Sequence, residues 1–318
     1  MAKQWKKQAL ELMVSTDLSW RQIAKEVGKA RSTVSDYLRK FKNDPEFMSE
    51  VVVPDNRPKI LLFDIETSLI KGYFWGLWKQ NISINQIIDD WYVLCWSAKW
   101  LGQQNVFNDS IHQHEQPLFK DNERWVVESL WKLLDEADVI VAYNGKSFDR
   151  KKMNTKFFQY GLPEPSPYKV VDPMLIIKGN FAMTSNKMDF IAKYIEDNDE
   201  TKHSTNIQLW VDCMENSSSA MDRMLDYCDQ DIIVLEQVYM AVRHWDKNSP
   251  QLSMYYDDNK PRCNSCGSDD LQVLENKHAH TSLSKFGIVR CNTCSKIMRD
   301  RTNQLSKEKR KSLHMNVR

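Results

Sequence analysis

No apolar run in the 318 residues approaches the roughly 20 that a helix needs to cross a bilayer. The first residues, 1–7, are polar and lack the apolar stretch of a secretory signal. No internal repeat is present, which excludes a repeat array. From these absences we expect a cytoplasmic protein without a membrane partner.

Cysteine is sparse, with seven residues, and three of them lie singly among apolar neighbours, which predicts buried free thiols at Cys95, Cys213 and Cys228. The other four form two Cys-x-x-Cys pairs, which in a cytoplasmic chain indicate a metal site rather than disulfides. Two pairs separated by 24 residues predict one structural Zn²⁺, because four thiolates fill a tetrahedral shell. Two histidines between the pairs, His278 and His280, are alternative ligands. The predicted zinc ligands are Cys263, Cys266, Cys291 and Cys294.

The remaining composition is that of a globular chain with two or three domains, since hydrophobic residues make up 42% and charged residues 27%. The net charge of +1 conceals an asymmetry. Residues 1–43 carry ten Lys/Arg against four Asp/Glu, residues 260–318 carry thirteen against five, and the middle has a net charge of −13. Basic ends around an acidic centre suggest polyanion-binding arms beside a site that needs carboxylates; two solvated basic tails are the alternative.

Residues 1–43 predict an all-α helix-turn-helix domain with helices at 3–15, 20–27 and 32–42. Ala24 is small where two helices would touch, Gly28 falls where the turn needs a positive φ, and Val34 would pack the second helix against the first. A three-helix module that binds protein is the alternative. The last helix offers polar side chains to a DNA groove and its phosphates: Arg31, Ser32, Thr33, Ser35 and Arg39.

After a predicted linker at 44–57, residues 58–247 predict an α/β domain, followed by a zinc ribbon at 248–304 and a basic tail at 305–318. Three strands followed by helix, strand and helix is the order of an RNase H-like fold, a mixed sheet flanked by helices. Within the ribbon, Arg290, Lys296, Arg299 and Arg301 are candidates to meet phosphate. The α/β pattern predicts strands at 59–65, 72–78, 92–101, 139–143 and 169–172, and helices at 122–137, 148–160, 186–196 and 219–244.

Five side chains of this domain form a candidate catalytic set. Asp64 and Glu66 alternate along a buried strand and face the same side, where a charged pair is costly unless a metal compensates it. Asp149 follows a second buried strand at the start of a helix. Tyr227 and Asp231, four residues apart, share one helical face. Several carboxylates are what two divalent ions need to hydrolyse a phosphodiester.

In these motifs the domain resembles the DEDD, or DnaQ-like, exonuclease superfamily, and its bacteriophage members most of all. Residues 63–67 resemble the first motif, 144–149 the second and 227–231 the third. The tyrosine subtype is indicated, because Asp226 stands where the histidine subtype has its histidine. The stretch 185–210 is similar to an insert in those phage proteins.

The resemblance implies a 3′→5′ exonuclease that uses two Mg²⁺ or Mn²⁺ ions. Asp64 would bridge both ions, and Glu66 and Asp231 would complete the shell of one. Asp149 would support the second ion, and Tyr227 would hold the attacking water.

Three neighbours of these motifs have less specific roles. Asn144 would touch the terminal nucleotide. Asp229 is expected to be a solvated surface residue, because it faces elsewhere on the helix. Asp172, before Pro173, fits a helix N-cap and a supporting acid equally well.

The whole sequence predicts a metal-dependent exonuclease whose end domains bind nucleic acid, DNA in preference to RNA. No polymerase segment is visible, so a part in replication, proofreading, repair or recombination would involve other proteins in trans, in a bacterial or phage-infected cytoplasm. A transposase- or resolvase-type endonuclease is one alternative, although it would arrange its acids differently. A DNA-binding regulator with an inactive nuclease fold is another, against which the complete set of acids argues.

Overall fold

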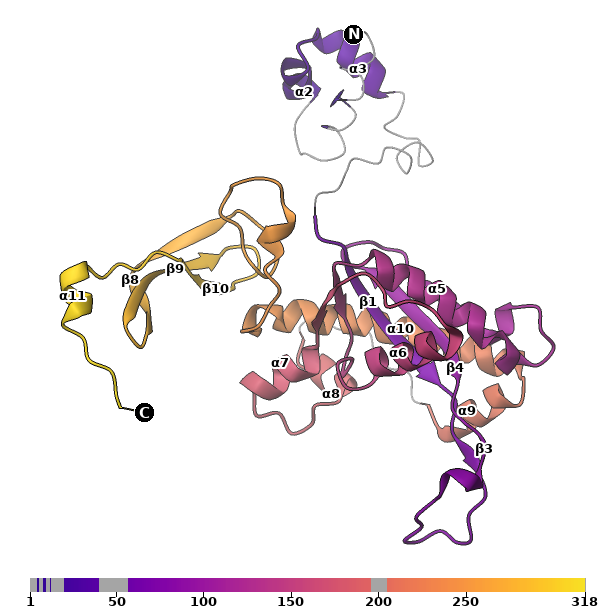
Figure 1. Cartoon of the computed structure of the whole chain (residues 1–318). Helices are drawn as coiled ribbons and strands as arrows, with labels where there is room; N and C mark the ends of the chain where they lie inside the picture. Colours follow the sequence, from indigo (N-terminus) through magenta and orange to yellow (C-terminus); the bar gives the residue numbers. More distant parts are fainter. Residues whose placement is uncertain are drawn as a thin grey trace. The chain divides into compact units, whose positions relative to one another are not determined.

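The computed structural model describes residues 5, 8, 9, 12, 20–39, 57–195 and 205–317. The chain forms two compact units, Met1–Arg57 and Pro58–Arg318, and Figure 1 labels most of their helices and strands. Of the described helices, none has the length and apolar character needed to span a membrane.

The first unit is built on a small apolar core shared by α2 (Trp20–Glu26) and α3 (Arg31–Arg39). In the turn between them Gly28 has a φ of +62°, as predicted, which side chains rarely tolerate. Of the predicted helix 3–15 only four positions are described, all helical; the predicted linker up to Asn56 lies outside the described residues. The buried core residues are Ala9, Ile23, Ala24, Val27, Val34 and Leu38.

The second unit contains a five-stranded mixed sheet. Its strands are β1 (Ile60–Thr67), β4 (Val93–Trp100), β5 (Phe107–Ser110), β6 (Val139–Val141) and β7 (Lys169–Val171). They lie in the order β5-β4-β1-β6-β7, with antiparallel pairs from β5 to β1 and parallel pairs from β1 to β7. This mixed sheet, with helices on both faces, has the RNase H-like fold that the order of elements predicted.

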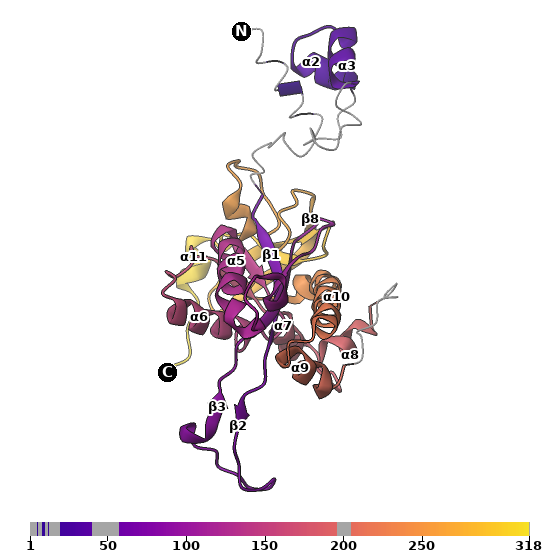
Figure 2. The same cartoon turned by 90° about the vertical axis from the view of Figure 1, so that its right-hand side faces the viewer.

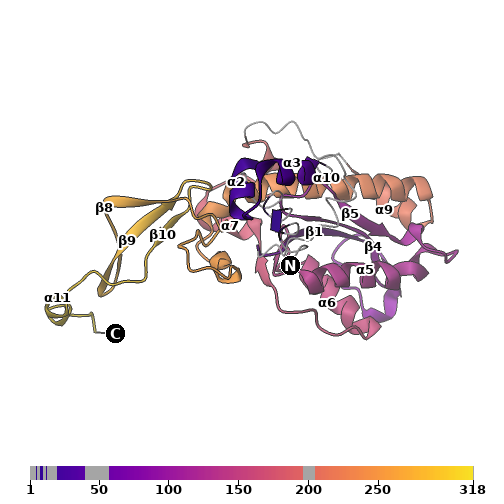
Figure 3. The same cartoon turned by 90° about the horizontal axis from the view of Figure 1, so that it is seen from above.

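Helices cover both faces of the sheet. Figure 3 shows α5 (Glu123–Glu136) and α6 (Asp149–Tyr160) along one face and α10 (Ser218–Val242) along the other. Shorter helices complete the layers: α7 (Pro173–Asn180), α8 (Met188–Ala192) and α9 (Ile207–Met214). Single 3-10 turns connect these elements at Ile84–Gln86, Ile111–Gln113, Phe119–Asn122, Arg243–Trp245 and Leu252–Tyr255.

The residues of β1 alternate between two apolar clusters. Leu61 and Phe63 pack with buried residues of α5 and α6, whereas Ile60 and Leu62 pack with the second half of α10 and with α7 and α8. Side chains two residues apart on a strand face the same side. The next even-numbered position, Asp64, therefore points toward α10, and Glu66 follows it.

The predicted strand at 72–78 is wrong. β2 (Lys71–Gly72) and β3 (Ile87–Asp89) form only a short ribbon, and most residues between them are exposed. The outer strand of the sheet is instead β5, whose residues Phe107 to Ser110 show no apolar alternation and are exposed at Phe107 and Asn108. An edge strand has a partner on one side only and tolerates polar residues, so periodicity alone does not reveal it.

A buried ion pair joins the two helices on the α5 face. The Lys156 ammonium lies 2.9 Å from the Glu123 carboxylate, and the two side chains are 5% and 6% exposed. The same carboxylate accepts hydrogen bonds from the Tyr160 hydroxyl at 2.5 Å and from the Val93 N–H at 2.7 Å. The pair therefore ties α5 to α6 and both to the start of β4.

The C-terminal part is a three-stranded antiparallel sheet of β8 (Leu271–Thr281), β9 (Ser284–Cys291) and β10 (Ile297–Arg299). It is joined to the turn after α10 by a hydrogen bond of 3.3 Å from the Ser265 hydroxyl to the Arg243 carbonyl. The basic tail contains a single helical segment in its described residues, α11 (Lys307–Lys311), capped by the Ser306 hydroxyl.

Candidate active site

Three carboxylates meet where β1 passes beneath α10. Asp64, Glu66 and Asp231 each offer one oxygen atom, and these atoms all lie within 4.8 Å of one another. Asp231 is only 3% exposed. Ionised carboxylates at such distances repel one another unless a cation compensates them, so this group has the composition and spacing of a cation site.

Asp149, the fourth predicted carboxylate, lies beside this group of three rather than within it. It is the first residue of α6 and is 2% exposed. Burial raises the pKa of Asp149 to about 7 and the charge of Asp172 adds to the rise, while backbone hydrogen bonds, including one from Ile65, lower it. Because Ile65 stands between Asp64 and Glu66, the Asp149 carboxyl borders the group.

Asp172 holds the loop that leads to Asp149 through hydrogen bonds. Its carboxylate accepts hydrogen bonds from the backbone N–H of Asn144 at 3.0 Å and of Lys146 at 3.3 Å. It also caps α7 by accepting from the Met174 N–H at 3.1 Å. The N-cap role that its position before Pro173 suggested is confirmed, and the same carboxylate also holds the loop before Asp149.

The same loop turns tightly after β6. A Cβ atom on Gly145 would lie 2.3 Å from the Ala142 Cβ, so the turn admits glycine alone. Asn144 has a φ of 62°, in the left-handed region where asparagine is tolerated. These two residues bring the chain from the end of β6 to Asp149 within one short loop.

The carboxylates border a cleft of about 810 Å³, which both Asp64 and Asp231 line. Two cations, Lys178 at the end of α7 and Lys187 before α8, line the same cleft. Sequence reasoning did not single out Lys178 or Tyr143; the only signal for Lys178 is a basic residue in the last turn of a helix. Other lining residues are Asn186, whose carbonyl accepts a 2.6 Å hydrogen bond from the Tyr143 hydroxyl, and Asp189.

Tyr227 lies on α10, one turn before Asp231. Its side chain is 8% exposed, and its ring meets Trp210 of α9 edge to face, with centroids 6.2 Å apart. The packing against Trp210 holds the tyrosine ring in place next to the turn that carries Asp231. The helix α9 therefore supplies a neighbour of the tyrosine.

Asp229 is not the solvated surface residue that we expected. It is half-buried and accepts hydrogen bonds from the Ser97 hydroxyl at 2.6 Å and from the Asn108 amide at 2.8 Å. Burial raises the pKa of Asp229, and these two hydrogen bonds oppose the rise. The residue binds α10 to β4 and β5, a contact between segments far apart in sequence that helical spacing does not reveal.

The three single cysteines are buried and free, as predicted. Cys228 lies next to the carboxylates, with its sulfur 3.9 Å from the Asp64 carboxylate. A hydrogen bond with Cys95 and burial both raise the pKa of the Cys228 thiol well above its ordinary value. These thiols are therefore neutral packing groups beneath the site.

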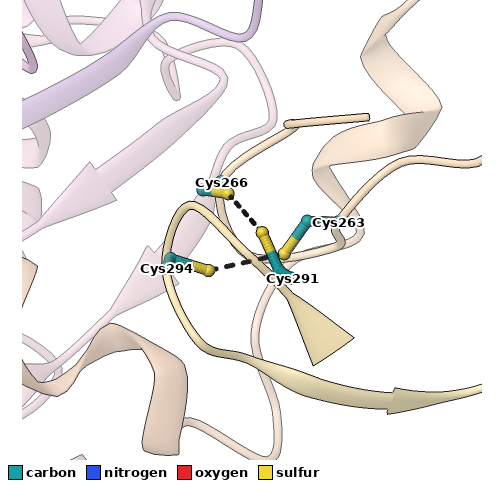
Figure 4. Close-up of side chains that lie close together, drawn as sticks. All are labelled: Cys263, Cys266, Cys291 and Cys294. Carbon is teal, nitrogen blue, oxygen red and sulfur yellow. Dashed lines mark hydrogen bonds between the residues drawn. The ribbon is translucent and has the colours of Figure 1, made fainter. Parts of the chain in front are cut away.

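The four paired cysteines converge in the C-terminal part, as Figure 4 shows. The sulfurs of Cys263 and Cys294 are 3.6 Å apart, as are those of Cys266 and Cys291, and all four lie within 4.8 Å of one another. Tetrahedral Zn²⁺ with thiolate bonds of about 2.3 Å requires sulfurs about 3.8 Å apart. The cluster fits that ion.

The local electrostatics of this cluster favour a thiolate. The Cys266 thiol donates a hydrogen bond to Cys263 and, with backbone N–H groups including that of Ser265, lowers the pKa of Cys263 to about 5. The alternative ligands His278 and His280 are exposed on β8 and are not members of the cluster. The cluster therefore consists of four cysteines without a histidine.

The residues predicted to contact nucleic acid differ in accessibility. Arg31, Ser32 and Thr33 are exposed at the start of α3, and Ser35 is half-buried, while the side chain of Arg39 lies outside the described residues. In the ribbon, Lys296 is not free to meet phosphate as expected. It is 6% exposed, and its ammonium donates to a backbone carbonyl.

The comparison with family models agrees with the fold. A family model described as the RNase_H superfamily matches residues 99–243, a range that includes Asp149, Tyr227 and Asp231. No curated protein matches the sequence. Among solved structures, the family B DNA polymerase from the hyperthermophilic archaeon Pyrobaculum calidifontis is similar, with 16% identity and a TM-score of 0.42. The similarity covers 59% of this chain but only 25% of the polymerase.

Proposed function

We propose that the protein is a metal-dependent nuclease that removes nucleotides from the 3′ end of a nucleic acid strand, with DNA as its substrate. The observation that carries this proposal is the group of Asp64, Glu66 and Asp231, whose oxygen atoms lie within 4.8 Å of one another beside an open cleft. The RNase H-like fold and the resemblance to DEDD exonucleases support it.

The donor set fits hard divalent cations, because carboxylate oxygens are the ligands that Mg²⁺ and Mn²⁺ prefer. Asp64, Glu66 and Asp231 would hold these ions, and Asp149 would support the second one from the border of the group. Two such ions, when bound, neutralise charge on the phosphate and lower the pKa of a water molecule.

The chain's own residues position the substrate and the water. Tyr227, one turn from Asp231, orients the attacking water through its hydroxyl. Lys178 and Lys187 attract the phosphates into a cleft whose other charged groups are acidic. Asn144, in the tight turn after β6, contacts the terminal nucleotide.

The experiment is a polarity assay on 20-nucleotide single strands carrying a label at either end. With Mg²⁺ or Mn²⁺ the 5′-labelled strand should shorten one nucleotide at a time, whereas the 3′-labelled strand should release its label as a mononucleotide at once. Without added divalent ions neither should change. Discrete internal cuts would favour the endonuclease alternative, and an inert protein would favour the inactive regulator.

We propose further that the first unit binds duplex DNA through α3, whose first residues Arg31, Ser32 and Thr33 are exposed. In the full chain, Arg31→Ala should weaken duplex binding and reduce the slope of log K against log salt by about 0.9, the loss of one phosphate contact. Arg124→Ala removes an exposed arginine from α5 and is the control. If the slope of log K against log salt is the same for both variants and the wild type, α3 does not contact DNA, and the first unit would instead bind a protein partner.

A further inference from the structure

Beyond β1 the chain leaves the sheet in a narrow extension, which we call the aromatic arm (residues 69–91); Figure 2 shows β2 and β3 within it. Its base is closed by Ser68 and Tyr92. The Ser68 N–H donates to the Tyr92 carbonyl at 2.8 Å, and the Tyr92 N–H donates to the Ser68 hydroxyl at 2.9 Å. The arm thus begins three residues after Glu66, just beyond the end of β1, the strand that carries two of the carboxylates.

The aromatic arm exposes side chains that a globular domain normally buries. Trp75 is 98% exposed, Trp78 84% and Tyr73 75%, and no residue of the arm is buried. Large apolar side chains gathered in this way mark an interaction surface. The other large exposed members are Ile70, Phe74, Leu77, Ile82, Ile84 and Ile88.

The backbone of the arm is nevertheless fixed by its own hydrogen bonds. The Gln86 side chain donates to the Tyr73 carbonyl at 2.8 Å and accepts from the Ser83 N–H at 2.9 Å. The Gln80 amide donates to the Trp78 carbonyl at 2.9 Å. A surface held in this way loses less conformational freedom when it binds a ligand than a slack loop would.

Negative charge, which dominates the middle of the chain, is missing from most of the arm. Between residues 72 and 88 the only charged side chain is Lys79. The two acids of the arm, Asp89 and Asp90, lie at its base, where Asp89 pairs with Lys120 at 3.4 Å. A polyanion can therefore approach the aromatic rings without meeting carboxylates.

We propose that the aromatic arm binds the single-stranded nucleic acid that the carboxylates cleave, with successive bases stacked on Tyr73, Trp75 and Trp78; this rests on the nuclease function proposed above. Every base has a flat π face, so stacking is tolerant of sequence. Trp75 is nine residues from Glu66 and hence within at most about 32 Å of it, a distance that one bound strand can bridge.

The position and composition of the arm favour nucleic acid over a protein occupant. It continues directly from the strand that bears Asp64 and Glu66. Among the described residues that line the cleft, Tyr143 is the only aromatic one, so bases beyond the terminal nucleotide need another surface on which to stack. The rings of the arm, with Lys79 and no carboxylate among them, offer that surface.

The test is the affinity of the full chain for fluorescein-labelled dT20 and dT3, measured by anisotropy without added Mg²⁺ or Mn²⁺. Trp75→Ala with Trp78→Ala should raise the dissociation constant for dT20 on the order of tenfold or more, because stacked bases are lost. Affinity for dT3, which spans only the cleft, should stay the same. Trp75→Phe with Trp78→Phe, which keeps the rings, should retain most of the dT20 affinity.

The matched control is Trp125→Ala, which removes a 44% exposed tryptophan from α5 and should leave both affinities unchanged. If the double alanine variant binds dT20 as tightly as the wild type, the arm does not bind the strand. If that variant also converts a wild-type dimer into a monomer, the arm is a contact between copies of the chain, and the proposal is overturned. Failure of the nuclease function looks different, because the wild type would bind dT20 yet release no nucleotide with Mg²⁺ or Mn²⁺.

Discussion

The proposed role of Tyr227, orienting the attacking water, depends on its hydroxyl group. Tyr227→Phe keeps the ring and its edge-to-face packing against Trp210 but removes the hydroxyl that would orient water. We expect kcat to fall about tenfold to a thousandfold, as for the loss of one positioning contact, and KM to change little. Tyr194→Phe, at a side chain 65% exposed, is the control. A raised KM with unchanged kcat would show that Tyr227 contacts a base instead.

Asp149 gives the metal-free protein a specific pH dependence. Its pKa is raised to about 7 by burial and by the nearby Asp172, whereas the unfolded chain has an ordinary aspartate pKa of about 3.9. Between these values the folded state binds more protons, so the contribution of this group to stability falls as pH rises from about 4 to about 7.

Thermal unfolding across pH 4–8 checks this dependence. Asp149→Asn is neutral at every pH, so this variant should be more stable than the wild type at pH 8, and the difference should shrink toward pH 4. Mg²⁺ should stabilise the wild type at pH 8 more than the variant. Parallel stability curves for the two proteins would contradict the raised pKa.

The Glu123–Lys156 pair holds the helices of the α5 face together. Lys156→Met leaves the buried Glu123 charge without its cation and should lower the free energy of unfolding by about 3–5 kcal/mol. Lys59→Met breaks the exposed pair with Glu136, whose side chains are about half exposed, and should cost less than about 1 kcal/mol. Denaturant unfolding of both variants measures the difference, and equal losses would show that burial adds nothing to the pair.

Elements with a strong periodic pattern were predictable from the sequence. The predicted helix at 219–244 corresponds to α10 at 218–242. It was predictable because one face of the helix packs on the sheet, which gives its apolar residues a helical period. The strand predicted at 72–78 was wrong, because its apolar residues face solvent in the aromatic arm rather than a core. The strand at 107–110 was missed, because its place at the sheet edge depends on pairing with Cys95 to Ala98 and not on its own composition.

In the candidate active site, too, contacts between residues close in sequence were predictable and contacts between distant residues were not. Strand alternation was enough to predict that Asp64 and Glu66 face one side. The position of Asp231 beside them depends on how α10 crosses the sheet. Strand alternation does not predict that crossing, so Asp231 was assigned to the site from the resemblance to DEDD exonucleases. The network of Asp229 with Ser97 and Asn108 links positions more than 100 residues apart, and no spacing rule reports such a contact.

At the scale of the whole molecule, we expect the four-cysteine cluster to stabilise the C-terminal part when it binds Zn²⁺. We expect one Zn²⁺ per chain in protein purified without added zinc, measured by elemental analysis. Cys266→Ser should lower the zinc content and loosen the ribbon, because metal binding and folding are coupled in such small sites. Cys95→Ser changes a thiol outside the cluster and is the control for zinc content. Zinc-free wild type with four freely titrating thiols would contradict the assignment.

The proposed nuclease activity depends on the carboxylates that β1 and α10 bring together. The most direct test is the initial rate at which a 5′-labelled single strand shortens with Mg²⁺ or Mn²⁺, compared between Asp231→Asn and Asp226→Asn. Both variants remove one carboxylate from the same helix, but only Asp231 belongs to the group of three, while Asp226 is exposed. We predict a loss of at least about a hundredfold for Asp231→Asn and a rate near that of the wild type for Asp226→Asn. Equal rates for the two variants would contradict the assignment of the active site.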